Sequence, residues 1–270
     1  MSAIELKDVS KSYGARRTID RVSLTVERGE RVVLFGPSGC GKSTLLHLIA
    51  GFIAPESGEI FIDGELVATV GKTLREPEER GIGMVFQDLA LWPHMTVAEN
   101  IEFGLRAQRY PDAERKRRVK GMVELVGLGD YLGAKPGQLS GGEQQRVALA
   151  RTLALSPRIV LMDEPLSSLD EALNAQLRME ILRLHREIGF TLLYVTHTPT
   201  EAADLGNRTI HLWDGRIVAR PQGRGGSSIV CPLPWNAVSG LSCSARPAAG
   251  SRRYCTSLPA SSLRTPAKFL

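Results

Sequence analysis

The feature that most constrains this chain is a glycine-rich loop between an apolar strand and an apolar helix. Residues Arg31–Phe35 have the pattern of a buried strand, and Lys42–Ala50 carries leucine and isoleucine at helical spacing. The loop motif is made of Gly36, Pro37, Ser38, Gly39, Cys40, Gly41, Lys42, Ser43 and Thr44. Glycines there let backbone N–H groups face phosphate oxygens, and the helix dipole favours negative charge. The loop therefore predicts a phosphate site, with Lys42 on the β- and γ-phosphates of a nucleotide and the Ser43 hydroxyl on Mg²⁺.

A second apolar strand, Ile159–Met162, runs into two carboxylates, Asp163 and Glu164, and then Pro165. A carboxylate at the end of a buried strand is costly unless a cation lies nearby, so Asp163 predicts a contact with Mg²⁺ through water. Glu164 points elsewhere because side chains alternate along a strand. The alternative is a pair of surface acids. Pro165 cannot continue the strand's hydrogen bonds.

Between these motifs lies Leu139-Ser140-Gly141-Gly142-Glu143-Gln144. Ser140 and Glu143 have the spacing of a helix capping box, which would be a sufficient structural explanation. The double glycine favours a binding role as well, because it leaves backbone N–H groups bare.

The three motifs, in this order, match almost letter for letter those of the ATPase cassettes of ABC transporters, and the resemblance runs from about Ile4 to Val218. It implies an α/β fold: a P-loop NTPase core of the ABC ATPase type, with an antiparallel β subdomain and an inserted helical subdomain. It also implies that ATP and Mg²⁺ bind and that ATP is hydrolysed.

The resemblance assigns roles to single residues. Glu164 corresponds to the general base that orients and polarises the attacking water. Gln87, after Met84-Val85-Phe86, matches the glutamine that touches Mg²⁺ and senses the γ-phosphate. His197 matches the switch histidine that contacts the γ-phosphate, and Tyr13 matches the aromatic residue that stacks on adenine.

Other residues are implied to act across a dimer. In the family, the segment equivalent to Ser140, Gly141 and Gly142 binds the γ-phosphate of ATP held by the other subunit. Ser168-Leu169-Asp170 matches a loop that communicates across the dimer, and Asp170 is counted among the binding residues. One chain holds one phosphate loop and one signature motif, so a second ATPase subunit is required. An identical copy is expected, and a similar subunit is the alternative.

Two positions depart from the family's pattern. Thr198-Pro199 follows the switch histidine, where the family often has aspartate, and Ser168 stands where alanine is usual. Proline donates no backbone hydrogen bond and restricts the residue before it. The turn is therefore expected to differ and to tune coupling rather than abolish it.

The segment after Gln87 resembles that of importer ATPases for ferric iron, sulfate, molybdate, polyamines and sugars. There it forms a groove for a coupling helix of the membrane permease, which implicates Leu91, Trp92 and Met95; the alternative is that these residues are core of the helical subdomain. The implied partners are permease transmembrane subunits and a substrate-binding protein. The implied location is peripheral, on the cytoplasmic face of the inner or plasma membrane.

Apolar periodicity organises the rest of the chain. A cassette is expected over residues 1–221, with a helical subdomain at about 96–155, including a helix over Glu114–Val126. A helical stripe of Leu173, Leu177, Ile181, Leu184 and Ile188 is expected to face the core. Further strands are expected at Ile4–Val9, Ser23–Val26, Ile60–Ile62, Gly83–Phe86, Thr191–Val195, Ile210–Trp213 and Ile217–Val218, the last two joined by an Asp-Gly hairpin turn.

Residues 222–270 differ in composition from the rest of the chain. They hold six basic residues, no acidic residue and no periodic pattern, and we expect them to be disordered. The formal net charge of +5 comes from this segment, so it does not predict nucleic-acid binding by the cassette. Cys231, Cys243 and Cys255 lie in it without a histidine or acidic cluster that would indicate a metal site. No apolar run reaches the roughly 20 residues that cross a bilayer, and no apolar signal segment opens the chain.

Two other functions remain compatible with a nucleotide site. A non-transport ABC ATPase acting on DNA or ribosomes would usually carry two cassettes in one chain or a long coiled coil, and the sequence shows neither. An inactive or regulatory binding subunit is disfavoured because Glu164 and His197 are both present. The cargo is not encoded in this chain, since in this family the permease and binding protein choose it.

Overall fold

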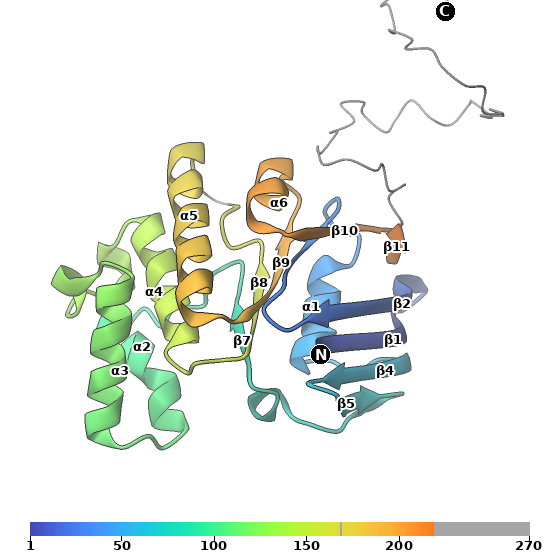
Figure 1. Ribbon diagram of the computed structural model, residues 1–270, viewed down its shortest axis with the longest axis horizontal. Coiled ribbons are helices and arrows are strands. Elements are labelled where there is room, and N and C mark those ends of the chain that lie inside the picture. The colour runs from blue at the N-terminus through green and yellow to red at the C-terminus, as the bar shows by residue number, and fades with distance from the viewer. Residues whose placement is uncertain (168, 219–270) are drawn as a thin grey trace, which may run out of the picture. The chain divides into compact units, whose positions relative to one another are not determined.

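The computed structural model describes residues 1–167 and 169–218, which form two sheets and the helices around them (Figure 1). The predicted α/β class is confirmed. Ser168, the tail expected to be disordered and its three cysteines lie outside the described residues. Within the described part, no helix is both long and apolar enough to cross a membrane.

The larger sheet has six strands in the order β11-β10-β3-β9-β8-β7. Their bounds are β11 Arg216–Val218, β10 Arg208–Trp213, β3 Arg31–Phe35, β9 Thr191–Thr196, β8 Ile159–Asp163 and β7 Ile82–Val85. All neighbours are parallel except β11, which returns from β10 through the predicted Asp-Gly turn. Strands β8 and β9 are buried along their whole length, as parallel strands covered on both faces are. The carboxyl ends of β3, β8 and β9 therefore meet at one edge.

The second sheet is antiparallel, in the order β2-β1-β4-β5-β6. Its strands are β1 Ser2–Tyr13, β2 Arg16–Glu27, β4 Ser57–Ile62, β5 Glu65–Thr69 and β6 Lys72–Thr73. The alternating patterns predicted the middle of β1 and the carboxyl-terminal part of β2, but both strands are longer because register shifts let them bend and continue. Strands β5 and β6 were not predicted.

Three helices fill the predicted helical region: α2 Val97–Ala107, α3 Asp112–Leu125 and α4 Gly141–Leu153. They pack on one another and lie as one group beside α5, Glu171–Ile188 (Figure 1). Helix α1, Lys42–Ala50, follows β3 as predicted, and the short α6, Pro199–Leu205, follows β9. Short 3-10 turns lie at Pro77–Glu79, Gly129–Tyr131 and Pro136–Gln138.

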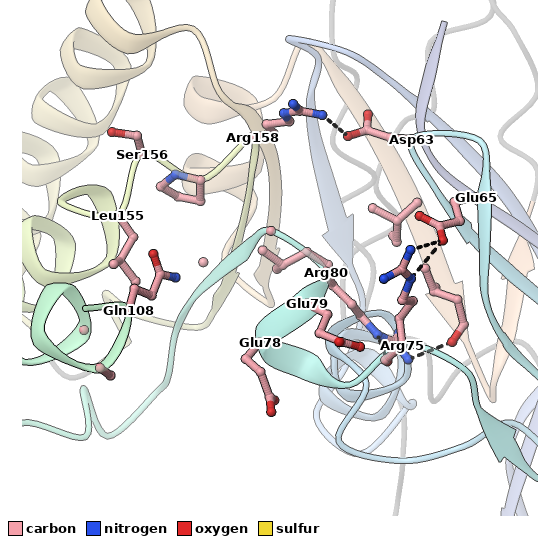
Figure 2. Close-up of a pocket in the computed structure, with 18 residues that line it drawn as sticks. Asp63, Glu65, Arg75, Glu78, Glu79, Arg80, Gln108, Leu155, Ser156 and Arg158 are labelled. Atoms are coloured by element: carbon pink, nitrogen blue, oxygen red, sulfur yellow. Dashed lines mark hydrogen bonds and ion pairs between the residues drawn. The ribbon is translucent and has the colours of Figure 1, made fainter. Parts of the chain in front are cut away.

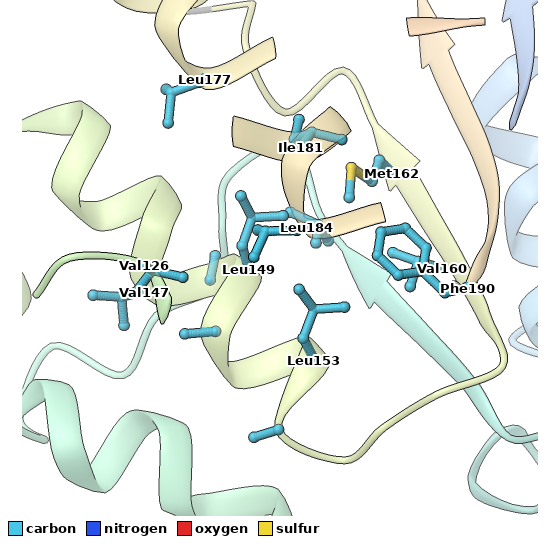
Figure 3. Close-up of a cluster of buried hydrophobic side chains, with 14 of the residues drawn as sticks. Val126, Val147, Leu149, Leu153, Val160, Met162, Leu177, Ile181, Leu184 and Phe190 are labelled. Atoms are coloured by element: carbon cyan, nitrogen blue, oxygen red, sulfur yellow. The ribbon is translucent and has the colours of Figure 1, made fainter. Parts of the chain in front are cut away.

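The core divides between the two faces of the parallel sheet. Val160 and Met162 of β8 point to a cluster shared with α4 and α5 (Figure 3), whereas Ile159 and Leu161 point to a second cluster shared with α1 and the antiparallel sheet. The predicted stripe on α5 is correct at Leu177, Ile181 and Leu184. Leu173 is partly buried and packs against the same core, but the prediction is wrong at Ile188, which is exposed at the last residue of the helix.

Arg80 is a buried cation that the sequence did not indicate. Its guanidinium donates to the carbonyls of Leu48 (3.1 Å) and Ile49 (2.8 Å) at the end of α1. It also donates to the carbonyls of Arg75 (3.0 Å) and Val67 (3.3 Å). Burial lowers the pKa of Arg80. Arg80 thus joins the end of α1 to the antiparallel sheet, at the wall of the hollow drawn in Figure 2.

Arg80→Met is expected to lower the free energy of unfolding by about 2–4 kcal/mol, because it leaves several buried carbonyls without a donor. Urea unfolding measures the change. Arg117→Met is the matched control, since Arg117 is 77% exposed and should cost less than about 0.5 kcal/mol. Equal effects of the two substitutions would contradict a structural role for the Arg80 contacts.

Candidate nucleotide site

The phosphate loop runs from the end of β3 to the start of α1 and is held by close backbone contacts. Gly41 caps α1 with φ of 108°, and a Cβ there would come 2.5 Å from the carbonyl oxygen of Thr18. A Cβ on Gly36 would come 2.2 Å from the carbonyl oxygen of Leu212. No side chain fits at either position, so the two glycines of the motif are required by this packing as well as by any ligand.

Lys42 lies inside the loop rather than on the surface. Its side chain is 3% exposed, and its Nζ donates to the carbonyls of Gly36 (2.9 Å) and Pro37 (3.0 Å). The same Nζ lies 3.2 Å from Oε1 of Glu164. The ammonium group is thus already held, largely dehydrated, at the place where the loop would bind phosphates. Orienting it therefore costs little free energy when a nucleotide binds.

Ser43 and Asp163 converge although they lie 120 residues apart. The Ser43 hydroxyl donates to Oδ1 of Asp163 over 3.0 Å. Burial raises the pKa of the Asp163 carboxyl, and the hydrogen bond from Ser43 opposes that rise. Gln87 lines the same hollow as Ser43. Hydroxyl, carboxylate and amide oxygens are the donors that Mg²⁺ prefers, so this set of residues fits the predicted ion.

Glu164 is the centre of the site's ionic contacts. Its Oε1 faces Lys42, and its Oε2 lies 2.9 Å from Nδ1 of His197. The residue adopts φ of 44°, a left-handed conformation that glutamate rarely takes, and its N–H donates to the carbonyl of Val195 (3.1 Å). Such strain persists only where surrounding contacts enforce it, and it occurs often at functional sites. The backbone turn aims this carboxylate away from Asp163 and into the hollow.

A hollow of about 370 Å³ brings half of the predicted nucleotide residues together. Its lining consists of Tyr13, Arg16, Thr18, Ser38, Gly39, Gly41, Lys42, Ser43, Thr44, Gln87 and Glu164. Tyr13 is 52% exposed at the rim, and the Lys11 ammonium lies over its ring, 5.8 Å from the ring centroid. The larger hollow of Figure 2, about 640 Å³, contains none of the predicted nucleotide residues.

Arg16 and Thr18 line the hollow but were missed by the sequence analysis. Arg16 donates to the carbonyl of Gly39 over 2.8 Å and so crosses the phosphate loop from β2. Its only sequence signal is its place three residues after Tyr13, which is too weak to separate it from Arg17. A cation here could contact a phosphate or a ribose oxygen.

The signature motif does not line this hollow. Ser140 caps α4 in a reciprocal capping box, in which the Ser140 N–H donates to Oε2 of Glu143 (2.8 Å) and the Glu143 N–H donates to the Ser140 hydroxyl (3.4 Å). A Cβ on Gly142 would come 2.8 Å from the Leu173 side chain, so this glycine has a packing role. Asp170 likewise caps α5, accepting from the Leu173 N–H (3.0 Å). Within one chain these predicted binding residues stay apart from the phosphate loop.

A family model described as ABC transporter matches residues 19–167, more than half of the sequence. The chain belongs to the ABC transporter family. The solved dimeric structure of a post-hydrolysis state of an ATP-binding cassette, bound to ADP and Pi, is 35% identical with a TM-score of 0.71. The similarity covers 83% of this chain and all of that one. The predicted ABC ATPase fold is therefore confirmed.

Curated ABC relatives are import ATP-binding proteins. The sn-glycerol-3-phosphate import ATP-binding protein UgpC 2 of Agrobacterium fabrum is 48% identical over 80% of this chain and 57% of its own length. The Fe(3+) ions import ATP-binding protein FbpC of Pasteurella multocida is 46% identical over 80% of this chain and 60% of its own length. The chain thus spans about three fifths of the relatives it matches.

The two residues that depart from the ABC pattern after His197, Thr198 and Pro199, lie at the start of α6. Pro199 occupies the first position of that helix, where its missing N–H is not needed. The Thr198 N–H donates to the Thr196 hydroxyl (2.9 Å), and Thr198 makes no side-chain cap. His197 still reaches Glu164, so the proline does not displace it.

Proposed function

We propose that this chain is the ATP-binding and ATP-hydrolysing subunit of an ABC importer. The observation that carries the proposal is the junction of β3, β8 and β9. There one carboxylate, Glu164, lies within 3.2 Å of the loop cation Lys42 and 2.9 Å from His197, beside the Ser43–Asp163 pair. A cation for phosphate, oxygen ligands for a metal and a base for water stand at one sheet edge, which is what phosphoryl transfer to water requires.

In this mechanism Tyr13 stacks on adenine, and the loop N–H groups with Lys42 hold the β- and γ-phosphates. Ser43, Gln87 and Asp163 would hold Mg²⁺, which supplies neutralisation of charge on the phosphate oxygens. Glu164 accepts a proton from the attacking water as the general base. His197, hydrogen-bonded to Glu164, orients that carboxylate and contacts the γ-phosphate.

A second copy of the chain would complete the site. Ser140, Gly141, Gly142 and Asp170 lie outside the hollow of their own chain, and their N–H groups and side chains are placed at helix starts, where anions bind. A partner's signature motif would close over the γ-phosphate, so that ATP is enclosed between two copies. Closure of this dimer would then drive translocation by the permease.

Permease docking is proposed at the segment after Gln87, together with aromatic residues that the sequence analysis missed. Trp92 lies against Phe103 with ring centroids 4.2 Å apart, and Phe52 stacks near Phe86 at 6.0 Å. Phe52 and Phe103 are both exposed. Leu91 is partly buried against the core and leaves part of its side chain for contact with a partner.

Asn100 holds this docking segment in shape. It is fully buried, accepts from the Trp92 N–H (3.0 Å) and donates to the carbonyls of Trp92 and Met95 (3.2 Å each). An ordered aromatic surface of this kind fits an amphipathic helix of a membrane partner. The proposal includes permease subunits, a substrate-binding protein and a peripheral location on the cytoplasmic membrane face. The relatives' names span several cargoes, so none is assigned.

Charged substitutions in the docking segment test the importer function. Leu91→Glu and Trp92→Glu are expected to leave basal ATP hydrolysis within about twofold, because neither side chain lines the nucleotide hollow. Copurification with the permease and transport should fall at least about tenfold, as for loss of an interface hot spot. Met179→Glu on α5 is the control, since Met179 is 63% exposed away from this segment. Normal transport by both docking variants would refute the docking role, and absence of ATP hydrolysis in the unmodified chain would refute the function itself.

A further inference from the structure

Behind the nucleotide site lies a connected set of buried polar side chains that the proposed mechanism does not use. It comprises Tyr194 of β9, Asn174 and Arg178 of α5, and Glu201 of α6, with exposed fractions of 0%, 5%, 6% and 2%. Burying four such groups together is costly unless each is satisfied. We call this set the α5–α6 network.

Glu201 is the centre of the α5–α6 network. Its Oε2 accepts from the Tyr194 hydroxyl (2.9 Å), and its Oε1 accepts from the Asn174 amide (2.9 Å). Burial and the neighbouring Glu201 carboxylate hold the pKa of Tyr194 well above its ordinary value, so its hydroxyl remains a donor. The carboxylate is therefore satisfied on both oxygens by residues from two other elements.

Arg178 is the positive charge of the network, and it is linked to Glu201 through the Asn174 amide. Its guanidinium donates to Oδ1 of Asn174, and it pairs with Glu171 (3.0 Å) and with Asp204 of α6 (3.0 Å). The Asn174 amide thus lies between the buried cation and the buried anion, and its orientation is set by both. A network satisfied in this way is rigid, because rotation of any member leaves a buried group unpaired.

The network holds both sides of the switch histidine. Tyr194 precedes His197 by three residues on β9, and Glu201 follows it by four on α6. Asn174 also donates to the carbonyl of Leu166 (3.2 Å), two residues beyond Glu164. Helix α6 has only seven residues and no side-chain cap, so its own start is weakly anchored.

We propose that Glu201 is a positioning residue that, through Tyr194 and Asn174, sets the distance between His197 and the Glu164 carboxylate. The 2.9 Å contact between these two side chains joins the ends of β8 and β9, where the Glu164 N–H also donates to the Val195 carbonyl (3.1 Å). A shift of about 1 Å in such a pair can cost about 10²-fold in rate. The inference rests on the proposed function, because it assumes that Glu164 acts on water.

Tyr194→Phe is the sharpest test, since it removes one hydroxyl and keeps the ring. The expected result is a fall in kcat of about tenfold with KM for ATP unchanged within twofold, because the phosphate loop is untouched. Amide hydrogen exchange over residues 196–202 should accelerate at least about tenfold. Glu201→Gln should also lower kcat and accelerate this exchange, because the new NH2 group would face one of the two donors, the Tyr194 hydroxyl or the Asn174 amide.

Thr152→Val is the matched control. Thr152 is equally a buried hydroxyl, but its bonds run to Ala148 (2.9 Å) and Met84 (3.3 Å), between α4 and β7. The Thr152→Val variant should keep both kcat and amide exchange over residues 196–202 within about twofold of the unmodified chain, as expected of a remote, independent site. In a His197→Ala background, Tyr194→Phe should cause no further loss of kcat, since it acts through His197.

Three results would overturn the proposal: unchanged exchange over 196–202 in Tyr194→Phe, an unchanged kcat, or a full tenfold loss that persists without His197. A loss of kcat in Thr152→Val equal to that in Tyr194→Phe would assign the effect to general stability instead. If the unmodified chain hydrolyses no ATP, the proposed function fails, while the exchange comparison still decides whether the α5–α6 network holds the His197 segment.

Discussion

Glu164→Gln is expected to lower kcat for ATP hydrolysis by about 10²–10⁴-fold while ATP still binds. The amide keeps the shape of the side chain and can still bond His197, which lies 2.9 Å from Oε2, but it cannot accept a proton from water. A coupled assay measures hydrolysis, and titration calorimetry measures binding. A variant that hydrolyses ATP at the normal rate would overturn the general-base role.

The same variant should accumulate as an ATP-bound dimer. Closure is favoured because nucleotide would bridge two copies, and hydrolysis normally reverses it. Gel filtration with light scattering, with and without Mg-ATP, should show a dimer for Glu164→Gln and mostly monomer for the unmodified chain. Adding Ser140→Arg should prevent closure, because the bulky arginine side chain would occupy the space in which the signature motif contacts the γ-phosphate. Loss of hydrolysis without dimerisation would leave the base assignment standing and undermine the enclosed dimer.

Lys42→Ala should weaken ATP binding by about 10–100-fold, because charge-assisted hydrogen bonds to phosphate contribute about 1.5–3 kcal/mol. Lys42 is also the residue that orders the loop, through the Gly36 and Pro37 carbonyls. Hydrolysis should fall with binding. Fluorescence titration with an ATP analogue measures affinity directly.

The control for this variant is Lys116→Ala, which removes a lysine that is 76% exposed on α3 and should leave ATP affinity unchanged. The melting temperature of Lys42→Ala must be followed as well, since Glu164 loses its ion-pair partner. ATP affinity within twofold of normal in a folded Lys42→Ala protein would contradict the phosphate-loop assignment.

Local patterns predicted the elements that depend on neighbouring residues. Strand β3, the glycine loop and α1 are contiguous, so their geometry follows from residues close in the chain. The Asp214-Gly215 turn was predicted by the same logic and is present. The equivalent Asp63-Gly64 signal, which joins β4 to β5, was overlooked, and with it β5 was missed.

Family resemblance predicted which residues belong to the nucleotide site, and the hollow gathers Tyr13, Gln87, Glu164 and most of the phosphate loop. It did not predict how they contact one another. Glu164 and Lys42 form an ion pair only because β8 and β3 end at the same sheet edge, separated by β9. Arg16 was missed for a related reason: its contact with Gly39 depends on the position of β2 beside the loop.

By itself, then, the sequence determined the phosphate loop, the buried strand before Asp163, the helix cap at Ser140 and the membership of the cassette family, because each is written in short contiguous motifs. The tertiary structure decided the rest. Arg80 and Glu201 are ordinary charged residues in sequence, and only packing shows that one joins α1 to the antiparallel sheet and the other lies behind His197. The physical reason is that a buried polar group is defined by its partners, and those partners lie on other elements that only the folded chain brings within hydrogen-bonding distance.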